Sequence, residues 1–448
     1  MQNLYLEVDS LKPAALFVAG VEEIAREAPD ALWVPATADV PDALMVGRRV
    51  LLLKPADLVR LEDLPTAFAR VFAFYLQSRE IEMEDVQIEY AAIRGMLSRL
   101  DRPTRLLVDN RLDDFRIRSR GSLSGIGCRL GMRQDEPTVI QVIEGSPSAA
   151  MGLLEGDRVI RIEGESTTNM PLSEVVSRLR GPSGTVVQLE VRRGQDGQVL
   201  SFQIQRDRIK LENVEAYRLT GDIGYVSISN FSDETLSNFR SRLERIAPGG
   251  HGLRGLVIDL RQNGGGSLKQ SAYMVDEFVE SGNIVKTQGR PSQDVQDLVR
   301  AIDAQAPQIL KDVPVAVLVD RRTASGAEIL AGALKYLDRA ILIGQRTYGK
   351  GSVQKVYPLN DHASLKMTVA RYLLPGEHYI QTIGLQPDIS LIPLVSEAGN
   401  IRFRYPAELP DEEDGDTRSS PTAPPSVGRE ETLSTVYYAV SYTHLRAH

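Results

Sequence analysis

The 448-residue chain has little of several residue types, and each shortage argues against a class of protein. A single cysteine, Cys128, excludes an internal disulfide. The formal net charge is -8 and no basic patch is interleaved with aromatic residues, so we expect no nucleic-acid partner. No long apolar run looks membrane-spanning. With 42% hydrophobic and 25% charged residues, the chain fits roughly two or three globular domains.

Histidine-based and cofactor-based motifs are also missing. A Ser/His/Asp triad needs a patterned histidine, but the five histidines form no recognisable pattern and favour surface positions: His251, His362, His378, His444 and His448. No HExxH or paired CxxC predicts a metal site, and no Walker A or GxGxxG motif predicts nucleotide binding. We therefore expect neither a metal nor a cofactor.

The chemistry that is present centres on Ser325 and Lys350. The apolar run PVAVLVD at residues 314–320 predicts a buried strand, and GAEILAGALKYL has helical apolar spacing. Ser325 is thus predicted where a strand turns into a helix, a place whose free N–H groups and helix dipole favour an anion. A lysine can take the serine proton only if burial lowers its pKa toward neutrality.

Both residues also have an ordinary structural interpretation. Ser325 and Glu328 have capping-box spacing, which by itself favours a helix cap. Lys350 lies between two glycines and precedes SVQKVYPL, a strand-like alternation that puts Gln354 on the side of the lysine. Lysines before apolar strands are usually solvated edge residues. The local pattern leaves both interpretations open.

A glycine-rich turn forms a second element. Residues 256–260 read as a buried strand, and residues 263–266 follow it as a turn before a helix. Glycines there leave backbone N–H groups unobstructed, as an oxyanion hole requires. A tight strand-to-helix turn without chemistry is the alternative.

These elements resemble the C-terminal processing peptidases, the S41 serine peptidases with a Ser/Lys dyad. The resemblance is carried by TASGAEILAGAL, IGQRTYGKGSVQ, LKMTVARYLLPGEHYIQTIGLQPDI and DLRQNGGG. It implies an α/β (α+β) core of the crotonase-like (ClpP/crotonase) kind at residues 210–395. It also implies that Ser325 is the nucleophile, Lys350 its general base and Gln354 the residue that orients the lysine. The oxyanion-hole donors it implies are Gly326 and either Gly265 or Gly266.

Residues 121–209 resemble an inserted PDZ domain, through SPSAAMGLLEGDRVIRIEG and RGPSGTVVQLEVRR. PDZ domains take a peptide onto a sheet edge and hold its terminal carboxylate with backbone N–H groups. The resemblance implies a groove helix at residues 172–179 and a carboxylate loop formed by Ser124, Gly125, Ile126 and Gly127. Arg180 could pair with a peptide carboxylate, with the peptidase domain, or with the last carbonyls of the helix. A module that only braces the fold stays an alternative.

The two ends carry weaker signals. Residues 1–120 are predicted to be mostly helical, and residues 1–80 could aid dimerisation or pack on the core. At residues 101–106, DRPTRL replaces the family's D-P-H-S-x-Y/F, a departure that affects only that loop. Residues 396–448 are predicted to be disordered, and VSYTHLRAH at 440–448 looks like a translated sequencing adapter and is left out of fold reasoning.

The resemblance implies a serine endopeptidase that cleaves proteins or peptides recognised by their exposed C-termini. It also implies the cell envelope, specifically the periplasm, although the first 30 residues show no signal peptide and we expect the true start to be missing. A homodimer and an activating or adaptor protein are open expectations. The alternative is a non-catalytic PDZ scaffold or adaptor with a silent peptidase domain.

Overall fold

The structure is a computed structural model that describes residues 5–38, 40–194, 197–290, 301–305, 310, 312–397, 400–403 and 436–441. The chain divides into two compact units. The first unit contains residues 1–114, 283–303 and 350–381, and the second contains the remaining three segments, 115–282, 304–349 and 382–448. The predicted core at 210–395 is therefore shared by both units, because some of its strands pair with residues near the N-terminus.

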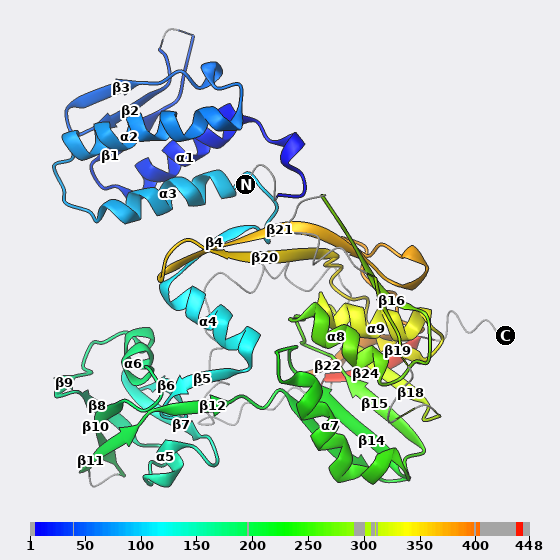
Figure 1. The fold of residues 1–448 in the computed structure, drawn as a ribbon. Helices are drawn as coiled ribbons and strands as arrows, with labels where there is room; N and C mark the ends of the chain where they lie inside the picture. The colour runs from blue at the N-terminus through cyan, green and yellow to red at the C-terminus, as the bar shows by residue number, and fades with distance from the viewer. Residues whose placement is uncertain are drawn as a thin grey trace. The chain divides into compact units, whose positions relative to one another are not determined.

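The N-terminal part of the first unit packs helices on a small sheet (Figure 1). Its helices are α1 (Pro13–Glu27), α2 (Leu64–Ser78) and α3 (Asp85–Leu97), and its antiparallel strands are β1 (Ala31–Val34), β2 (Ala43–Val46) and β3 (Arg49–Leu52). Their apolar side chains form one core, in which the ring centroids of Phe17 and Phe68 are 5.1 Å apart. The helices were expected, but four-residue strands carry too little alternation to be predicted.

A second sheet in the first unit joins segments far apart in the sequence. Its strand order is β17-β16-β21-β20, and β4 also pairs with β21. The strands are β4 (Arg105–Val108), β16 (Asn283–Gly289), β17 (Ile302–Asp303), β20 (Ser352–Pro358) and β21 (Ala363–Leu373). The register of β20 against β21 shifts at one point, where Val353 faces Ala370 and Gln354 faces Thr368. Val369 is therefore the extra residue of a β-bulge.

The largest sheet lies in the second unit and has the strand order β13-β14-β15-β18-β19-β22-β23. The pairs β14–β15, β15–β18, β18–β19 and β19–β22 are parallel, whereas the edge strands β13 and β23 pair antiparallel. They are β13 (Val214–Leu219), β14 (Ile223–Ile228), β15 (Gly255–Asp259), β18 (Val315–Val319), β19 (Ala340–Gly344), β22 (Ile389–Glu397) and β23 (Asn400–Phe403). The predicted strands at 256–260 and 314–320 are confirmed as β15 and β18, and the α/β class with them.

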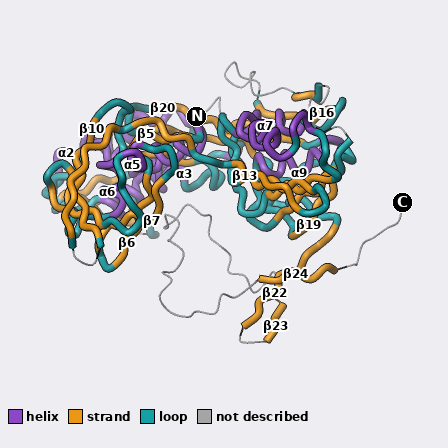
Figure 2. Tube along the Cα trace, turned by 90° about the horizontal axis from the view of Figure 1, so that it is seen from below, coloured by secondary structure: helices purple, strands orange, loops and turns teal. Residues whose placement is uncertain are grey.

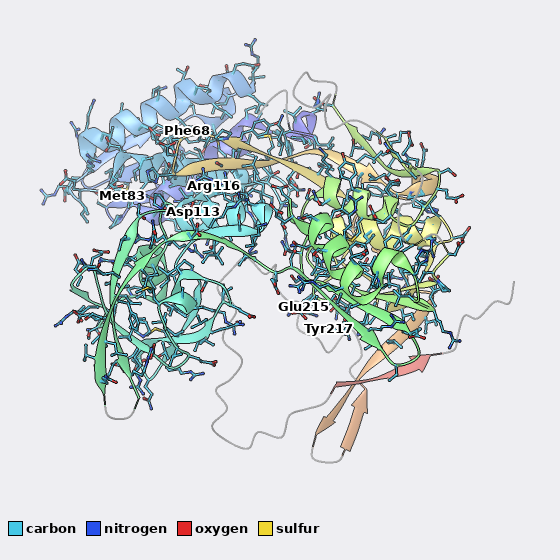
Figure 3. All side chains as sticks on the ribbon, turned by 60° about the horizontal axis from the view of Figure 1, so that its bottom comes forward. Phe68, Met83, Asp113, Arg116, Glu215 and Tyr217 are labelled. Carbon is cyan, nitrogen blue, oxygen red and sulfur yellow. The ribbon has the colours of Figure 1, made fainter. Side chains whose placement is uncertain are left out.

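Three helices cover one face of this sheet, α7 (Thr235–Ile246), α8 (Leu268–Asp276) and α9 (Gly326–Tyr336). Figure 2 shows α7 and α9 on the same side of β13 and β19. Side chains that face the helices, such as Val226, Ile258 and Val317, are fully buried. On the edge strand β13, the hydroxyl of Tyr217 donates to Glu215 Oε2 at 3.0 Å, and Figure 3 labels both residues.

The PDZ region also belongs to the second unit and is built on a sheet of order β11-β10-β8-β7-β6, with β9 on β8. Its elements are β6 (Cys128–Arg133), β7 (Glu136–Val142), α5 (Pro147–Ala150), β8 (Arg158–Ile162), β9 (Glu165–Ser166), α6 (Leu172–Leu179), β10 (Val186–Arg193) and β11 (Gln198–Gln205). Two short strands, β5 (Ser122–Gly125) and β12 (Asp207–Lys210), pair where the chain enters and leaves it. Helix α4 (Asp109–Arg120) precedes them.

Part of the predicted disordered tail forms strands. β23 and β24 (Val436–Ser441) both pair with β22, and β24 includes Val440 and Ser441, the first two residues of the stretch that looks like a translated adapter. The run VYYAVS is aromatic and β-branched, which suits a strand whatever the composition around it. The rest of that tail, 398–399, 404–435 and 442–448, lies outside the described residues. Across the described ranges, none of the helices combines the length and apolar character that crossing a membrane demands.

Candidate active site

Ser325 lies between β18 and the first residue of α9, as the sequence predicts. Its backbone has φ 55° and ψ -118°, whereas an ordinary N-cap residue has an extended backbone. A non-glycine residue at positive φ is strained and persists only where its surroundings impose that conformation. Ser325 is therefore held in a turn that simple helix capping does not require.

Glu328, the third residue of α9, is fully buried and holds this turn. Its Oε2 atom accepts a hydrogen bond from the Ser325 N–H at 2.9 Å. Its Oε1 atom accepts one from the Gly349 N–H at 2.8 Å and another from the Thr347 hydroxyl. One carboxylate thus ties the serine turn to the loop that ends at Gly349. The capping box predicted for Ser325 and Glu328 is present. The bond from Gly349 leaves no local pattern in the sequence, because that residue is 21 positions from Glu328.

Asn263 ties the glycine-rich turn to the serine turn. It is fully buried, and its side-chain amide donates to the Ile228 carbonyl at 2.8 Å. Its Oδ1 atom accepts from the Gly265 N–H at 2.8 Å, and its carbonyl accepts from the Ala324 N–H at 2.9 Å. The ends of β14, β15 and β18 are therefore linked through a single residue, which uses both its side chain and its main-chain carbonyl.

Two glycines of this turn are packed too closely for any side chain, Gly265 against the serine turn and Gly266 against Phe231. A Cβ atom on Gly265 would lie 2.5 Å from the Ala324 carbonyl oxygen and 2.7 Å from the Gly326 nitrogen. A Cβ atom on Gly266 would lie 2.0 Å from the Phe231 carbonyl oxygen. Both glycines have positive φ, 97° and 138°, which is the second reason that only glycine fits. Backbone amides from two turns therefore meet beside Ser325.

An ion pair closes the end of β15 next to these glycines. Arg261 donates to both carboxylate oxygens of Asp259, and the Tyr225 hydroxyl donates to Asp259 Oδ2 at 2.6 Å. The hydrogen bonds that Arg261 donates to Asp259 hold the pKa of Arg261 above its usual range, and burial together with the same carboxylate raises the pKa of Tyr225. This cluster keeps the strand end rigid rather than offering a proton donor at neutral pH.

Lys350 and Gln354 belong to the first unit. The Lys350 carbonyl accepts a hydrogen bond from the Tyr372 hydroxyl at 2.6 Å, and β20 begins two residues later. The predicted strand is confirmed as β20. The side-chain amide nitrogen of Gln354 donates to Ser352 Oγ at 2.8 Å, so these two residues share a face of the strand as predicted.

The predicted carboxylate loop of the PDZ region is anchored through its carbonyls. The Ile126 carbonyl accepts from the Ser148 N–H at 2.8 Å, and the Gly127 carbonyl accepts from the Ser146 hydroxyl at 3.0 Å. Ser124 and Gly125 lie in β5, where they pair with β12. The predicted groove helix is confirmed as α6, with the same bounds.

Arg180 follows α6 directly, and its N–H donates to the Val176 carbonyl at 3.1 Å. The last carbonyls of the helix are bound by a different arginine, which sequence analysis did not single out. Arg206 donates to the Arg178 carbonyl at 2.8 Å and to the Leu179 carbonyl at 3.2 Å. No local pattern shows this contact, because Arg206 is 27 residues from Leu179.

Two further kinds of residue bear on the chemistry of the chain, the groups that could bind a metal ion and the single cysteine. Among the residues that the structure describes, no group of three or more histidine, cysteine, aspartate or glutamate side chains is placed to hold a metal ion. Cys128 lies in the PDZ region, where burial raises the pKa of its thiol to about 11. A thiol with such a pKa is almost wholly protonated at neutral pH and is a poor nucleophile.

Comparisons with known proteins place these features in a family. The model of peptidase family S41 matches residues 222–391, and the PDZ domain model matches residues 115–192. The chain is 36% identical over 308 residues to a carboxy-terminal-processing protease of Bartonella bacilliformis, which covers 68% of this chain and 70% of that protein. It is 32% identical over 371 residues to a carboxyl-terminal-processing protease of Synechocystis, which covers 80% of this chain and 85% of that protein. Among solved structures, it is similar to a photosystem II D1 C-terminal processing protease, with 26% identity, a TM-score of 0.42 and coverage of 85% and 93%.

Proposed function

Because the chain belongs to the C-terminal processing peptidases of family S41 and is a serine-type peptidase with a PDZ domain, we propose a Ser/Lys mechanism for it. Ser325 is the nucleophile, Lys350 its general base and Gln354 the residue that orients the lysine. The observation that carries the proposal is the strained backbone of Ser325 at the start of α9. Such strain is retained where function depends on it.

In this mechanism the neutral amine of Lys350 takes the proton of the Ser325 hydroxyl, and the serine oxygen attacks a peptide carbonyl carbon. The resulting ammonium gives its proton to the leaving amine. A water molecule, deprotonated by the same lysine, then attacks the acyl-enzyme ester, and the lysine returns that proton to the Ser325 oxygen as it leaves. Glu328 supports the pairing, since it binds the N–H groups of Ser325 and of Gly349, the residue directly before Lys350.

The oxyanion forms beside two backbone amides. Gly326 supplies one, because the first N–H groups of a helix have no partner within the helix. Of Gly265 and Gly266, we favour Gly266 as the second donor. The Gly265 N–H is already bound to Asn263 Oδ1. The two backbone bonds between this turn and Phe231 use the Gly265 carbonyl and the Ser267 N–H, so neither of them uses the Gly266 N–H. Gly266 is also exposed, while Gly265 is buried.

We further propose that the PDZ domain selects substrates by an exposed, apolar C-terminus, held between β6, α6 and the loop 124–127. The substrates are proteins or peptides, and the site of action is the periplasm of the cell envelope. This part rests on the PDZ match and on the family resemblance. An adaptor protein and a homodimer are compatible with it and are not required by the mechanism.

The nucleophile is tested with purified variants and β-casein as an unstructured protein substrate. Ser325→Ala is expected to abolish turnover. Ser267→Ala is the matched control, because Ser267 is an ordinary N-cap whose Oγ accepts the Gln270 N–H at 3.3 Å in the same unit. It should lose about 1 kcal/mol of stability and keep its turnover. If Ser325→Ala cleaves casein as fast as the parent, Ser325 is a cap and the assignment fails.

Lys350→Ala separates the peptidase from a PDZ scaffold. If the protein is a peptidase, the parent cleaves substrate, while Lys350→Ala loses turnover and still binds a fluorescent peptide with a free apolar C-terminus. If it is a scaffold, the variant binds the peptide as well as the parent does, and neither protein shows turnover. The pH profile of kcat/KM adds a second measurement. A lysine base requires activity that rises through a pKa well below the free value of about 10.4.

A further inference from the structure

The segment 101–106, where the sequence departs from the family motif, is joined to β21 by hydrogen bonds in the first unit. The Thr104 hydroxyl donates to Asp101 Oδ1 at 2.6 Å, and the Thr368 N–H donates to Thr104 Oγ1 at 3.0 Å. The Thr368 hydroxyl donates to Asp101 Oδ2. Thr104 and Thr368 are 3% and 5% exposed, so water does not compete for these bonds. This loop therefore reaches the strand that faces Gln354.

Gln354 is aimed at this group by the β-bulge. Gln354 lies directly opposite Thr368, one residue beyond the point where the register shifts. Bulges redirect side chains and are common beside active sites. The amide nitrogen of Gln354 lies 2.8 Å from Ser352 Oγ and 3.5 Å from Thr368 Oγ1. Its two N–H bonds are thus directed at two hydroxyl oxygens.

The direction of these bonds follows from the chemistry of the groups. A carboxylate can only accept hydrogen bonds, so the single O–H of Thr368 donates to Asp101. Thr368 Oγ1 is then left as an acceptor toward Gln354, and only the amide nitrogen of Gln354 can face it. The carbonyl oxygen, Oε1, must point the other way. The lysine amine carries N–H donors both as the neutral base and as the ammonium that forms during the reaction, so Oε1 is the end of the amide that can accept from it.

We propose that Asp101 and Thr368 are positioning residues that set the amide orientation of Gln354, so that its Oε1 atom is presented to the general base. The inference rests on the proposed role of Gln354. Asp101 touches neither Gln354 nor any reacting atom and acts through the hydroxyl of Thr368. Asp101, which the loop shares with the family motif, therefore has a proposed role of its own, separate from that of the residues around it.

The test compares Thr368→Val with Thr368→Ser, using casein turnover. Valine keeps the shape and removes the hydroxyl, so the amide can rotate and kcat should fall about tenfold with KM within about twofold. Serine keeps the hydroxyl and should stay within about twofold of the parent kcat. In a Gln354→Ala background, Thr368→Val should have no further effect on kcat. Asp101→Ala removes the acceptor instead of the hydroxyl and replaces Thr368→Val in the test if the valine variant fails to fold. Its kcat should also fall in the parent protein and not fall further in the Gln354→Ala background.

Asp30→Asn is the control for loss of a carboxylate in the same unit. Its Oδ2 atom accepts the N–H groups of Glu80 and Ile81, far in sequence from the loop 101–106, and its replacement should leave kcat unchanged. An equal loss of kcat from Thr368→Val with and without Gln354, or no loss in either, would overturn the inference. Ser325→Ala is measured alongside. If that variant retains turnover, the proposed function itself is wrong. If Ser325→Ala loses turnover while the effects of Thr368→Val and Gln354→Ala on kcat are additive, only the positioning role is wrong.

Discussion

The two halves of the proposed active site are built from different materials. The first half combines the glycine-rich turn at 263–266 with the serine turn at 325–328, and its main-chain groups are held by the buried side chains of Asn263 and Glu328. The lysine strand, β20 with its neighbours Thr368 and Asp101, is held by side-chain hydroxyl and carboxylate groups. In the first half, Gly265 and Gly266 leave no room for an added carbon atom, while the second half depends on which polar groups it contains. The two halves should therefore fail under different kinds of substitution.

The largest effect is expected when a carbon atom is added at Gly265 in the glycine-rich turn. In Gly265→Ala the new Cβ would meet the Ala324 carbonyl oxygen at 2.5 Å and Ser325 Cβ at 2.7 Å, at a φ of 97°. The turn must move, and with it the oxyanion donors, so casein turnover should fall by about 100-fold or more. Gly264→Ala is the matched control, because nothing lies within 4 Å of its added Cβ. Equal turnover in the two variants would show that the turn is not part of the site.

A smaller effect is expected when the buried carboxylate of the serine turn becomes an amide. Glu328→Gln offers only one acceptor oxygen for donors that now bind two, so a buried N–H or hydroxyl loses its partner at a cost of about 1–3 kcal/mol. We expect a lower thermal midpoint and roughly tenfold slower turnover.

The control for that variant is Glu277→Gln, which alters a carboxylate that is also buried, at 2% exposure, and is paired with Arg240. This control should lose stability and keep its turnover. A Glu328→Gln enzyme as fast as the parent would mean that the link between Ser325 and Gly349 has no catalytic part.

The smallest effect concerns the pH dependence of stability on the side of the lysine strand. The oxygen of Tyr5 accepts the Asp101 N–H at 3.2 Å, and burial raises the pKa of Tyr5 to about 12. The raised pKa means that the folded state keeps the phenol proton more firmly than the unfolded state does. This contribution is fully present below the unfolded pKa of 10.0 and is lost as the pH rises to about 12.

Urea unfolding between pH 9 and about pH 12 measures this contribution. The parent protein should lose stability more steeply with pH than Tyr5→Phe, which has no phenol proton to lose. Parallel pH profiles for the two proteins would contradict the raised pKa of Tyr5 in the folded state.

Much of the fold was predictable because it depends on local apolar patterns. The strands β15, β18 and β20 and the helix α9 follow from local apolar runs or alternation, whereas α6 was implied by the resemblance to PDZ domains. The S41 and PDZ matches confirm the family that the motifs resembled. The sheet of β1, β2 and β3 was missed because its strands are only four residues long. β24 was missed because a disordered composition surrounds it.

The sequence by itself determined which residues can do the chemistry. A serine at the start of a helix, a lysine between glycines and a glycine-rich turn are chemical identities, and no packing is needed to read them. Only the tertiary structure decided how they are held. Glu328, Asn263 and Asp101 act through partners that lie in other strands or loops, and hydrogen bonds between distant segments leave no periodic trace in a sequence. The strain at Ser325 is likewise a property of the folded chain, because a φ of 55° is imposed by surrounding contacts and not by the residue itself.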